Sequence, residues 1–576
     1  MQIWDLKALF ASEKECEQNA LNLQKECEKF KDKYLAKYEN LKTDQFLKAF
    51  EEFENLVAKI SKVMTYAFLN FAKDTSKGAF YAKIDEIATK ANENLIFFEI
   101  KFNEFAPKKQ EEIIKSSKKY GYYLSNLAKA KTHQLSVAEE RVLLRTASTG
   151  AEGFSRLFDE SMSKMRFKFK GELLNEEEIL AKLHESDQSV RKLAAKSLSS
   201  ELSKHQHLLG YIYNMIKTDL KTSCELRNFK LPEEPRHLEN QITKKSVDSL
   251  IAVTEKNFDL VSKFYERKRE ILGLKKLYDY DRYAPLSSEG EYKFDECKKI
   301  VLKAFSNFSS EFGKIAKNAF NDGWIDVYPA PNKRGGAFSH SGSSDTHPYV
   351  LLNHTNQRRD LFTLAHELGH AVHQKLSYSV SYLNSDTPLT TAETASVFCE
   401  MLVFDHIKDG LSKKEKISLL AGKIEDIFAT LYRQINFTTF ERAVHAHEGE
   451  ISLDELNKIW LRESKKMFGK SVTLNDYYKI WWSYIPHFIH TPFYCYAYSY
   501  AQLLVLALFG LYKSGKCKNF VEIYTEFLSL GGSLSPKELV GKFGFDIDDK
   551  NFWQIGINEV KKLVDEFLEI SKGIKC

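Results

Sequence analysis

A short histidine motif offers the clearest chemistry in this chain. Residues 366–370 read HELGH, which is an H-E-x-x-H pattern. On a helix, His366 and His370 lie one turn apart on the same face, so both imidazoles can bind one tetrahedral zinc ion. Glu367 then lies beside the ion without binding it, where a general base can take a proton from an attacking water. The motif predicts metal-assisted hydrolysis.

A catalytic zinc ion usually takes three protein ligands and keeps one position open. His373 follows His370 too closely along the helix to serve as the third ligand. The extended motif H-E-x-x-H-x-x-G-x-x-H also fails, because positions 373 and 376 are His and Leu. A glutamate on a following helix is the other common solution, and Glu393 in PLTTAETASVFCE meets it. Glu393 could instead close a capping box with Thr390; we favour the ligand role.

A second glutamate on the same predicted helix has a supporting role. Glu400 lies seven residues after Glu393 and therefore on the same helical face. We expect its carboxylate to accept a hydrogen bond from the distal N–H of a liganding imidazole and so orient the ring. Asp360 and Asp405 are the alternatives for this role.

The helix that carries the motif is itself visible in the sequence. Leu361, Leu364, Ala365 and Leu368 form an apolar stripe at helical spacing. Gly369 inside this helix costs about 1 kcal/mol relative to alanine. We therefore expect another backbone, or the metal, to approach closely at Gly369.

The composition predicts a large, mostly α fold with several lobes. The 576 residues include only 26 Gly and 11 Pro, below the usual shares of about 7% and 5%. Residues 1–185 show successive amphipathic patterns, such as 15–38, 44–65 and 92–105, and predict an N-terminal helical lobe without chemistry. Residues 186–576 are expected to form the catalytic domain.

One stretch departs from the helical pattern. Residues 323–353 are rich in Gly, Ser and Pro and contain two strand-like runs, 325–328 and 349–352, with a flexible loop between them. A small β element beside the metal helix could pair with an extended peptide as an added strand. A surface hairpin with a long tip is the alternative.

Charge and cysteine usage exclude several partners. A formal net charge of +5 is nearly balanced for this length, so we expect no nucleic-acid partner. The eight cysteines are scattered without C-x-x-C and read as reduced thiols of a cytoplasmic protein. No signal peptide is expected, because the N-terminus lacks a basic region followed by an apolar core. The apolar run 503–509 is too short to span a bilayer, so we expect no membrane partner.

Beyond the motif, the chain resembles the oligoendopeptidase F family, relatives of the thimet-type oligopeptidases. The resemblance is strong from about residue 270 onward and weaker, mainly helical character, before that. The stretches that carry it are YDRYAPL (280–286), KRGGAFS (333–339), LFTLAHELGHAVH (361–373), PLTTAETASVFCEML (388–402), IPHFIHTPFYCYAYSYA (485–501) and FLSLGGSLSPKELVGKFGFD (527–546).

The resemblance implies an all-α, clam-like fold with a deep substrate channel and a zinc endopeptidase activity on short peptides. It implies one Zn²⁺ held by His366, His370 and Glu393, with Glu367 as the base. The other implied catalytic residues are His487, Tyr494 and Tyr496. The implied substrate-binding residues are Gly335, Gly336, Ala337, His490 and Tyr498. His490 departs from the family pattern, and the tyrosine that faces the metal is left open.

Two other functions compete with a zinc endopeptidase. A zinc aminopeptidase of the H-E-x-x-H type holds the substrate amine with a G-x-M-E-N segment, and this sequence contains none. A helical peptide-binding protein with a decayed metal site is the second alternative. The intact motif, with Glu393 at a suitable spacing, argues against decay.

Overall fold

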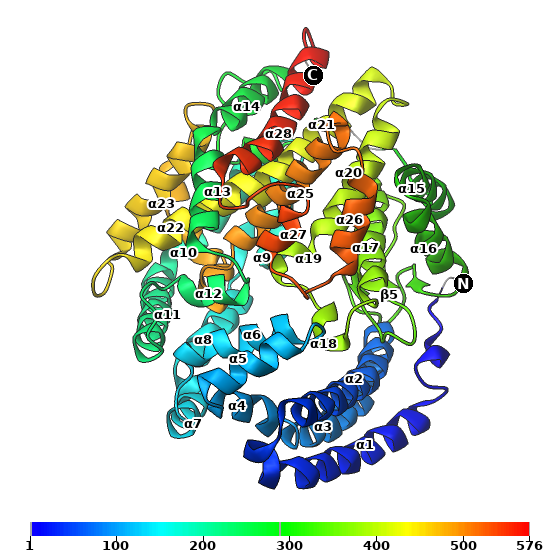
Figure 1. Cartoon of the computed structure of the whole chain (residues 1–576). Coiled ribbons are helices and arrows are strands. Elements are labelled where there is room, and N and C mark those ends of the chain that lie inside the picture. The colour runs from blue at the N-terminus through cyan, green and yellow to red at the C-terminus, as the bar shows by residue number, and fades with distance from the viewer. Residues whose placement is uncertain (1–2, 287–289, 575–576) are drawn as a thin grey trace. The chain divides into compact units, whose positions relative to one another are not determined.

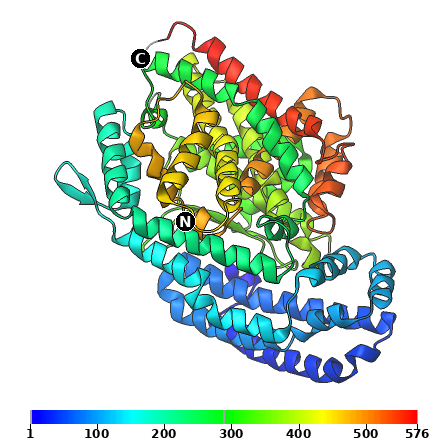
Figure 2. The same ribbon diagram turned by 90° about the vertical axis from the view of Figure 1, so that its left-hand side faces the viewer.

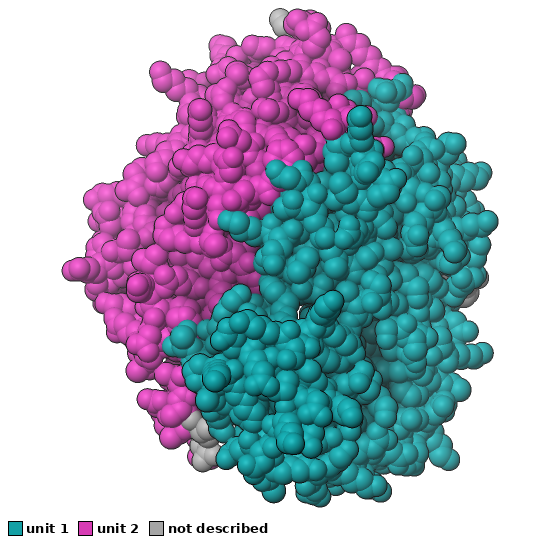
Figure 3. Space-filling view, viewed as in Figure 1, with its two compact units in different colours: residues 1–132, 290–409, 517–544 teal, residues 133–289, 410–516, 545–576 magenta. Residues whose placement is uncertain are grey.

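Helices dominate the chain, as its low glycine and proline content predicts. The computed structural model describes residues 3–286 and 290–574, and its ribbon is almost entirely helical (Figure 1). The predicted mostly α fold is confirmed. Two compact units form, each from three chain segments: unit 1 from residues 1–132, 290–409 and 517–544, and unit 2 from residues 133–289, 410–516 and 545–576 (Figure 3). The predicted boundary at residue 185 divides the chain by sequence into two domains, whereas these units are groups of residues that lie close together. The boundary stays a prediction.

Unit 1 holds fourteen of the described α-helices and one small sheet. Its elements are α1 (Glu13–Tyr34), α2 (Thr43–Lys73), α3 (Gly78–Glu93), α4 (Phe97–Glu104), α5 (Pro107–Ser116), α6 (Gly121–Ala130), α15 (Phe294–Phe308), α16 (Ser310–Asn321), β3 (Ile325–Asp326), β4 (Phe338–His340), β5 (Tyr349–Leu351), α17 (Arg358–Ser377), α18 (Tyr382–Ser385), α19 (Leu389–Ala392), α20 (Thr394–Lys408), α26 (Phe520–Ser529) and α27 (Pro536–Gly541).

Unit 2 is built in the same helical manner, with one short hairpin. Its elements are α7 (Val137–Thr146), α8 (Ala151–Lys164), β1 (Phe167–Phe169), β2 (Glu172–Leu174), α9 (Glu176–Ala181), α10 (Gln188–Lys204), α11 (Gln206–Leu226), α12 (Glu234–Glu239), α13 (Lys244–Lys256), α14 (Asp259–Ile271), α21 (Lys413–Ile427), α22 (Arg433–His445), α23 (Leu453–Phe468), α24 (His487–His490), α25 (Tyr496–Ser514) and α28 (Lys550–Ile570).

Each unit packs its own apolar core. The first three helices of unit 1 lie against one another (Figure 2), and α2 buries Phe46 and Phe50 against Phe98 of α4. In unit 2 the core is rich in aromatic rings, and Phe488 of α24 packs on Phe440 of α22. Burial of such rings supplies most of the free energy that holds helices together.

The small sheet of unit 1 differs in part from the sequence prediction. Strands β3 and β5 form inside the two predicted runs, but the predicted flexible loop contains a third strand, β4. The order is β3-β5-β4, with β3 parallel and β4 antiparallel to β5. Gln374 of α17 fixes β4, since its amide donates to the Ser339 carbonyl at 3.1 Å and accepts from the Ser339 hydroxyl at 2.7 Å. The strand therefore depends on tertiary contacts that its sequence does not predict.

Helix α17 packs against α20, and the two lie side by side (Figure 1). At Gly369 the approach is so close that an added Cβ would lie 2.6 Å from the Cα of Ser396 and 2.7 Å from the carbonyl oxygen of Ala395. The expectation that another backbone approaches Gly369 is confirmed.

Within residues 3–286 and 290–574, no helix combines the length and the apolar character that a membrane span requires.

Replacing Gly369 with alanine should destabilise the protein, because α17 and α20 must separate to admit the methyl group. We expect the free energy of unfolding to fall by about 1–3 kcal/mol, the usual cost of overpacking a core, and the melting temperature in scanning calorimetry to fall with it. The matched control is Gly541→Ala, where an added Cβ meets nothing within 4 Å. Equal melting temperatures for the two variants would contradict this reading of the helix contact.

Candidate metal centre

Helix α17 starts with a cap that its sequence provides. The carboxylate of Asp360 accepts hydrogen bonds from the backbone N–H groups of Gln357, at 3.0 Å, and Thr355, at 2.7 Å. These bonds satisfy the N–H groups of the N-cap residue and of the segment that precedes the helix. Asp360 is therefore engaged at the start of the helix, and the structure does not use it to orient an imidazole.

Two turns later, α17 brings its motif histidines together with Glu393. His366 Nε2 lies 3.2 Å from His370 Nε2, and Glu393 Oε2 lies 3.2 Å from His366 Nε2 and 3.4 Å from His370 Nε2. Zinc bonds of about 2.1 Å at tetrahedral angles separate ligand atoms by about 3.4 Å. The spacing of the three ligand atoms is therefore compatible with one tetrahedral metal ion.

Glu393 reaches this position from the junction of α19 and α20. It is the N-cap residue of α20, and its side chain makes no capping hydrogen bond. The carboxylate instead accepts a hydrogen bond from the Ser396 hydroxyl at 2.8 Å. The capping-box alternative does not describe this geometry. Ser396, which sequence reasoning missed, orients the Glu393 carboxylate. Its sequence signal is its place three residues after a predicted ligand.

Glu400 contacts the other side of the first histidine. Its Oε1 lies 2.6 Å from Nδ1 of His366. An Nδ1–H donated to this carboxylate leaves the Nε2 lone pair free to bind a cation. Glu400 thus makes the contact with His366 that is expected of the orienting partner.

The electrostatics of the site favour a cation. Burial lowers the pKa of His366, but hydrogen bonds to Glu393 and Glu400 outweigh it and bring that pKa to about 10. Such a shift means that two carboxylates attract positive charge at this place. Burial also raises the pKa of Glu367 above its usual range, and this side chain is only 7% exposed. A carboxyl group with a raised pKa is suited to exchange a proton near neutral pH.

His373 does not join the cluster. Its side chain is buried, and burial lowers its pKa to about 4, so the ring is neutral at physiological pH. This placement agrees with the argument from helical spacing that excluded it as a ligand.

The predicted substrate loop also belongs to unit 1. Gly335 and Gly336 are exposed, Ala337 is half-buried, and Gly336 has a φ of +78°. Asn353 holds the loop, because its amide donates to the carbonyl of Gly336 at 2.8 Å. The loop leads directly into β4, the strand that Gln374 of α17 holds by hydrogen bonds.

The remaining candidates belong to unit 2, around α24 and the start of α25. Nε2 of His487 lies 3.3 Å from the Tyr498 hydroxyl, and the Tyr494 and Tyr498 ring centroids are 5.0 Å apart. We call these three residues the imidazole–phenol cluster. Burial and the nearby Arg433 lower the pKa of His487, so its imidazole is neutral at pH 7.

Two predicted residues lie outside this cluster. Nε2 of His490 lies 2.8 Å from a carboxylate oxygen of Asp159 on α8. Tyr496 is fully buried, and its hydroxyl lies 2.9 Å from Nδ1 of His237 and 3.0 Å from the amide of Asn240. A phenol in this position can reach a peptide only if its contacts open, so its placement does not support direct contact with substrate.

Comparison with known proteins identifies the family of this chain. The profile of peptidase family M3 matches residues 181–559, and that of oligopeptidase F matches residues 101–167. An oligoendopeptidase F homolog of Borreliella burgdorferi is 29% identical over 97% of this chain and 98% of its own.

Solved structures extend the agreement to the fold. A crystal structure from Chlamydophila abortus aligns with a TM-score of 0.89 and 25% identity, covering 99% of this chain and 98% of the other. The oligoendopeptidase-F of Enterococcus faecium aligns with a TM-score of 0.71 and 21% identity over 96% of this chain and 98% of its own, and shares the fold. The chain therefore belongs to peptidase family M3 and, within it, to the oligoendopeptidase F family of metalloendopeptidases.

Proposed function

We propose that this chain is a cytoplasmic zinc endopeptidase that hydrolyses internal bonds of short oligopeptides. One observation carries the proposal: His366, His370 and Glu393 each offer one ligand atom, and these atoms are 3.2–3.4 Å apart. Bound zinc supplies a Lewis acid that activates water and polarises the scissile carbonyl.

Glu367 performs the proton transfers. It takes a proton from the attacking water as the tetrahedral carbon forms, and then gives that proton to the leaving amine. Its burial supports this role, because a raised pKa brings a carboxyl group closer to the pH at which it must both accept and release a proton.

The imidazole–phenol cluster is proposed to serve the oxyanion. The hydroxyls of Tyr494 and Tyr498 and an N–H of His487 are donors of the kind that stabilise negative charge on a carbonyl oxygen, at roughly 3 kcal/mol per donor. The backbone of Gly335, Gly336 and Ala337, beside β4, is proposed to hydrogen-bond an extended peptide. His490, which lies next to Asp159, is proposed to contact another part of the substrate.

Replacing Glu367 with glutamine should abolish cleavage and leave metal content unchanged. The amide keeps the size of the side chain but cannot take a proton, and general-base catalysis contributes about 10²–10⁴-fold. Peptide turnover and zinc content by mass spectrometry check this. Glu86→Gln, on an exposed helical face, is the control. Normal turnover by the Glu367 variant would refute the assignment of the base.

Replacing Glu400 with glutamine should weaken zinc binding. Loss of the negative charge beside His366 reduces the basicity of the ligand, and partners of this type are worth about 10–100-fold in metal affinity. Competition with a fluorescent chelator measures the dissociation constant. Glu111→Gln, which alters an exposed i,i+4 pair, should leave it unchanged. An affinity equal to that of the wild type would show that Glu400 does not orient the ligand.

The products of a mixed peptide library separate endopeptidase from aminopeptidase action. We expect internal bonds to be cut in peptides with acetylated N-termini, because the sequence lacks the G-x-M-E-N segment with which H-E-x-x-H aminopeptidases hold the free amine. We also expect chelator to stop cleavage and zinc to restore it. Mass spectrometry reads both effects. Removal of single residues from free N-termini alone would favour the aminopeptidase instead.

A further inference from the structure

The segment Thr491–Tyr498, which we call the tyrosine segment, contains a strained residue. Phe493 has a φ of +59°, in the left-handed region that costs an L-residue roughly 1–2 kcal/mol. Among residues 3–286 and 290–574, the other non-glycine residues with positive φ are Lys170, Asn228, Gln241, Asn332 and Asn356. A large aromatic side chain in this region is unusual and needs compensation from its surroundings.

A buried carboxyl group on α22 supplies that compensation. Glu441 is fully buried, and its Oε1 accepts a hydrogen bond from the Phe493 N–H at 2.8 Å. Burial raises the pKa of Glu441 to about 8, against the opposing effect of this bond. One turn further along α22, the His445 ring packs on the Phe493 ring with centroids 4.8 Å apart. The same helix thus holds both the backbone and the side chain of Phe493.

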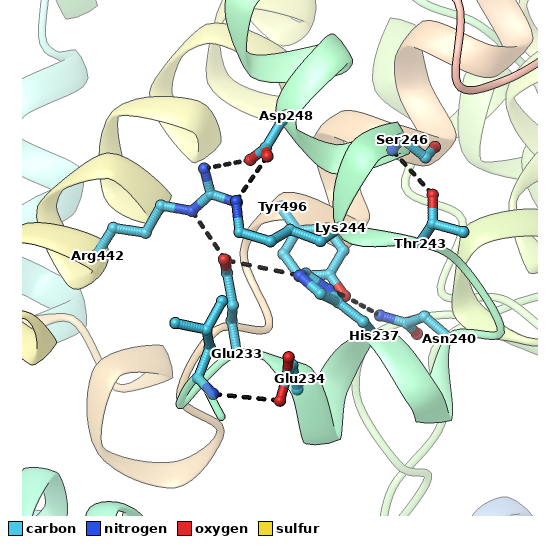
Figure 4. A network of polar contacts seen from close by, with 11 residues as sticks. Glu233, Glu234, His237, Asn240, Thr243, Lys244, Ser246, Asp248, Arg442 and Tyr496 are labelled. Atoms are coloured by element: carbon cyan, nitrogen blue, oxygen red, sulfur yellow. Dashed lines mark hydrogen bonds and ion pairs between the residues drawn. The ribbon is translucent and has the colours of Figure 1, made fainter. Parts of the chain in front are cut away.

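A second set of contacts holds the tyrosine segment at Tyr496 (Figure 4). Asn240 donates to the phenol oxygen at 3.0 Å, so the phenol O–H can donate to Nδ1 of His237 at 2.9 Å. Nε2 of His237 then lies 3.7 Å from a carboxylate oxygen of Glu233. Arg442, the neighbour of Glu441 on α22, holds that carboxylate with its Nε at 2.8 Å. Every member of this chain of contacts except Arg442 is buried.

Tyr494 lies in the chain between the residues that these two sets of contacts hold, Phe493 and Tyr496. It is only half-buried. The Arg236 guanidinium lies over its ring at 5.8 Å from the centroid. Contacts on both sides of Tyr494 fix the backbone from which its phenol projects, which contributes to the preorganisation that an oxyanion donor needs.

We propose that α22 positions the tyrosine segment for catalysis, through Glu441 at the Phe493 N–H and through Arg442, Glu233 and His237 at the Tyr496 hydroxyl. The inference rests on the proposed function, since it concerns the donors of the imidazole–phenol cluster. Tyr496 is then a positioning residue, and Tyr494 and Tyr498 are the tyrosines that contact substrate.

A double-mutant cycle tests the Glu441 contact. E441A should lower kcat about 10- to 100-fold, the scale of a small misplacement of catalytic groups, with KM and zinc content unchanged. E441Q should recover most of kcat, because its amide oxygen can still accept from Phe493. In the F493G background, where glycine adopts positive φ without strain, E441A should cost at least threefold less. Equal costs in both backgrounds would overturn the proposal.

A second pair of variants separates positioning from direct contact at Tyr496. If His237 acts through Tyr496, then Y496F, H237A and the double variant should lose kcat by similar factors. A loss by Y496F far above that of H237A would overturn the assignment. Tyr500 provides the matched control, because it is also buried on α25 and its hydroxyl lies 2.8 Å from that of Ser246. Y500F should keep kcat within about twofold.

Hydrogen exchange measured by mass spectrometry tests positioning without relying on activity. E441A should speed exchange in peptides that cover residues 491–498, and Y500F should not; unchanged exchange in E441A would overturn the proposal. A wild-type protein that cleaves no peptide would refute the proposed function, and the exchange result would still decide whether Glu441 holds the segment.

Discussion

The metal site depends on how closely two helices approach. The motif histidines and Glu393 come from different helical segments, and they meet because α17 and α20 are almost in backbone contact at Gly369. A side chain at this position would clash with the backbone of Ala395 and Ser396, so the two helices would have to separate. Glycine costs free energy inside a helix, but here it permits the close packing of α17 against α20. Glu400, on the same helix as Ser396, gains its contact with His366 from the same approach.

Electrostatics then suit the cluster to a cation. Carboxylates surround the imidazoles, and together they hold positive charge strongly enough to raise the pKa of His366 despite its burial. Glu367 lies in the same field but is shielded from water, so its pKa moves upward. The three glutamates of this cluster are therefore proposed to take three roles, as ligand, orienting partner and base. Their surroundings, rather than their residue type, separate these roles.

Unit 2 orders its candidate residues in another way, through strain and burial. Phe493 adopts a backbone conformation that it would avoid in isolation, and Glu441 stabilises it from a buried position. Such an arrangement persists only when several contacts determine it together. The hydroxyl of Tyr496 adds one of them, and the backbone that carries the neighbouring phenols is thereby held at two points.

The sequence by itself determined the helical class of the protein and the convergence of His366 and His370, because periodicity and i,i+4 spacing are local properties of a helix. It also favoured Glu393 as the third ligand over a capping role, since that residue lies at the start of the next predicted helix. Only the tertiary structure selected Glu400 over Asp360, formed β4 inside a predicted loop, and buried Tyr496. The bonds from Tyr496 to His237 and from Phe493 to Glu441 join residues 259 and 52 positions apart. Contacts at such separations follow from packing, which no local pattern of residues encodes.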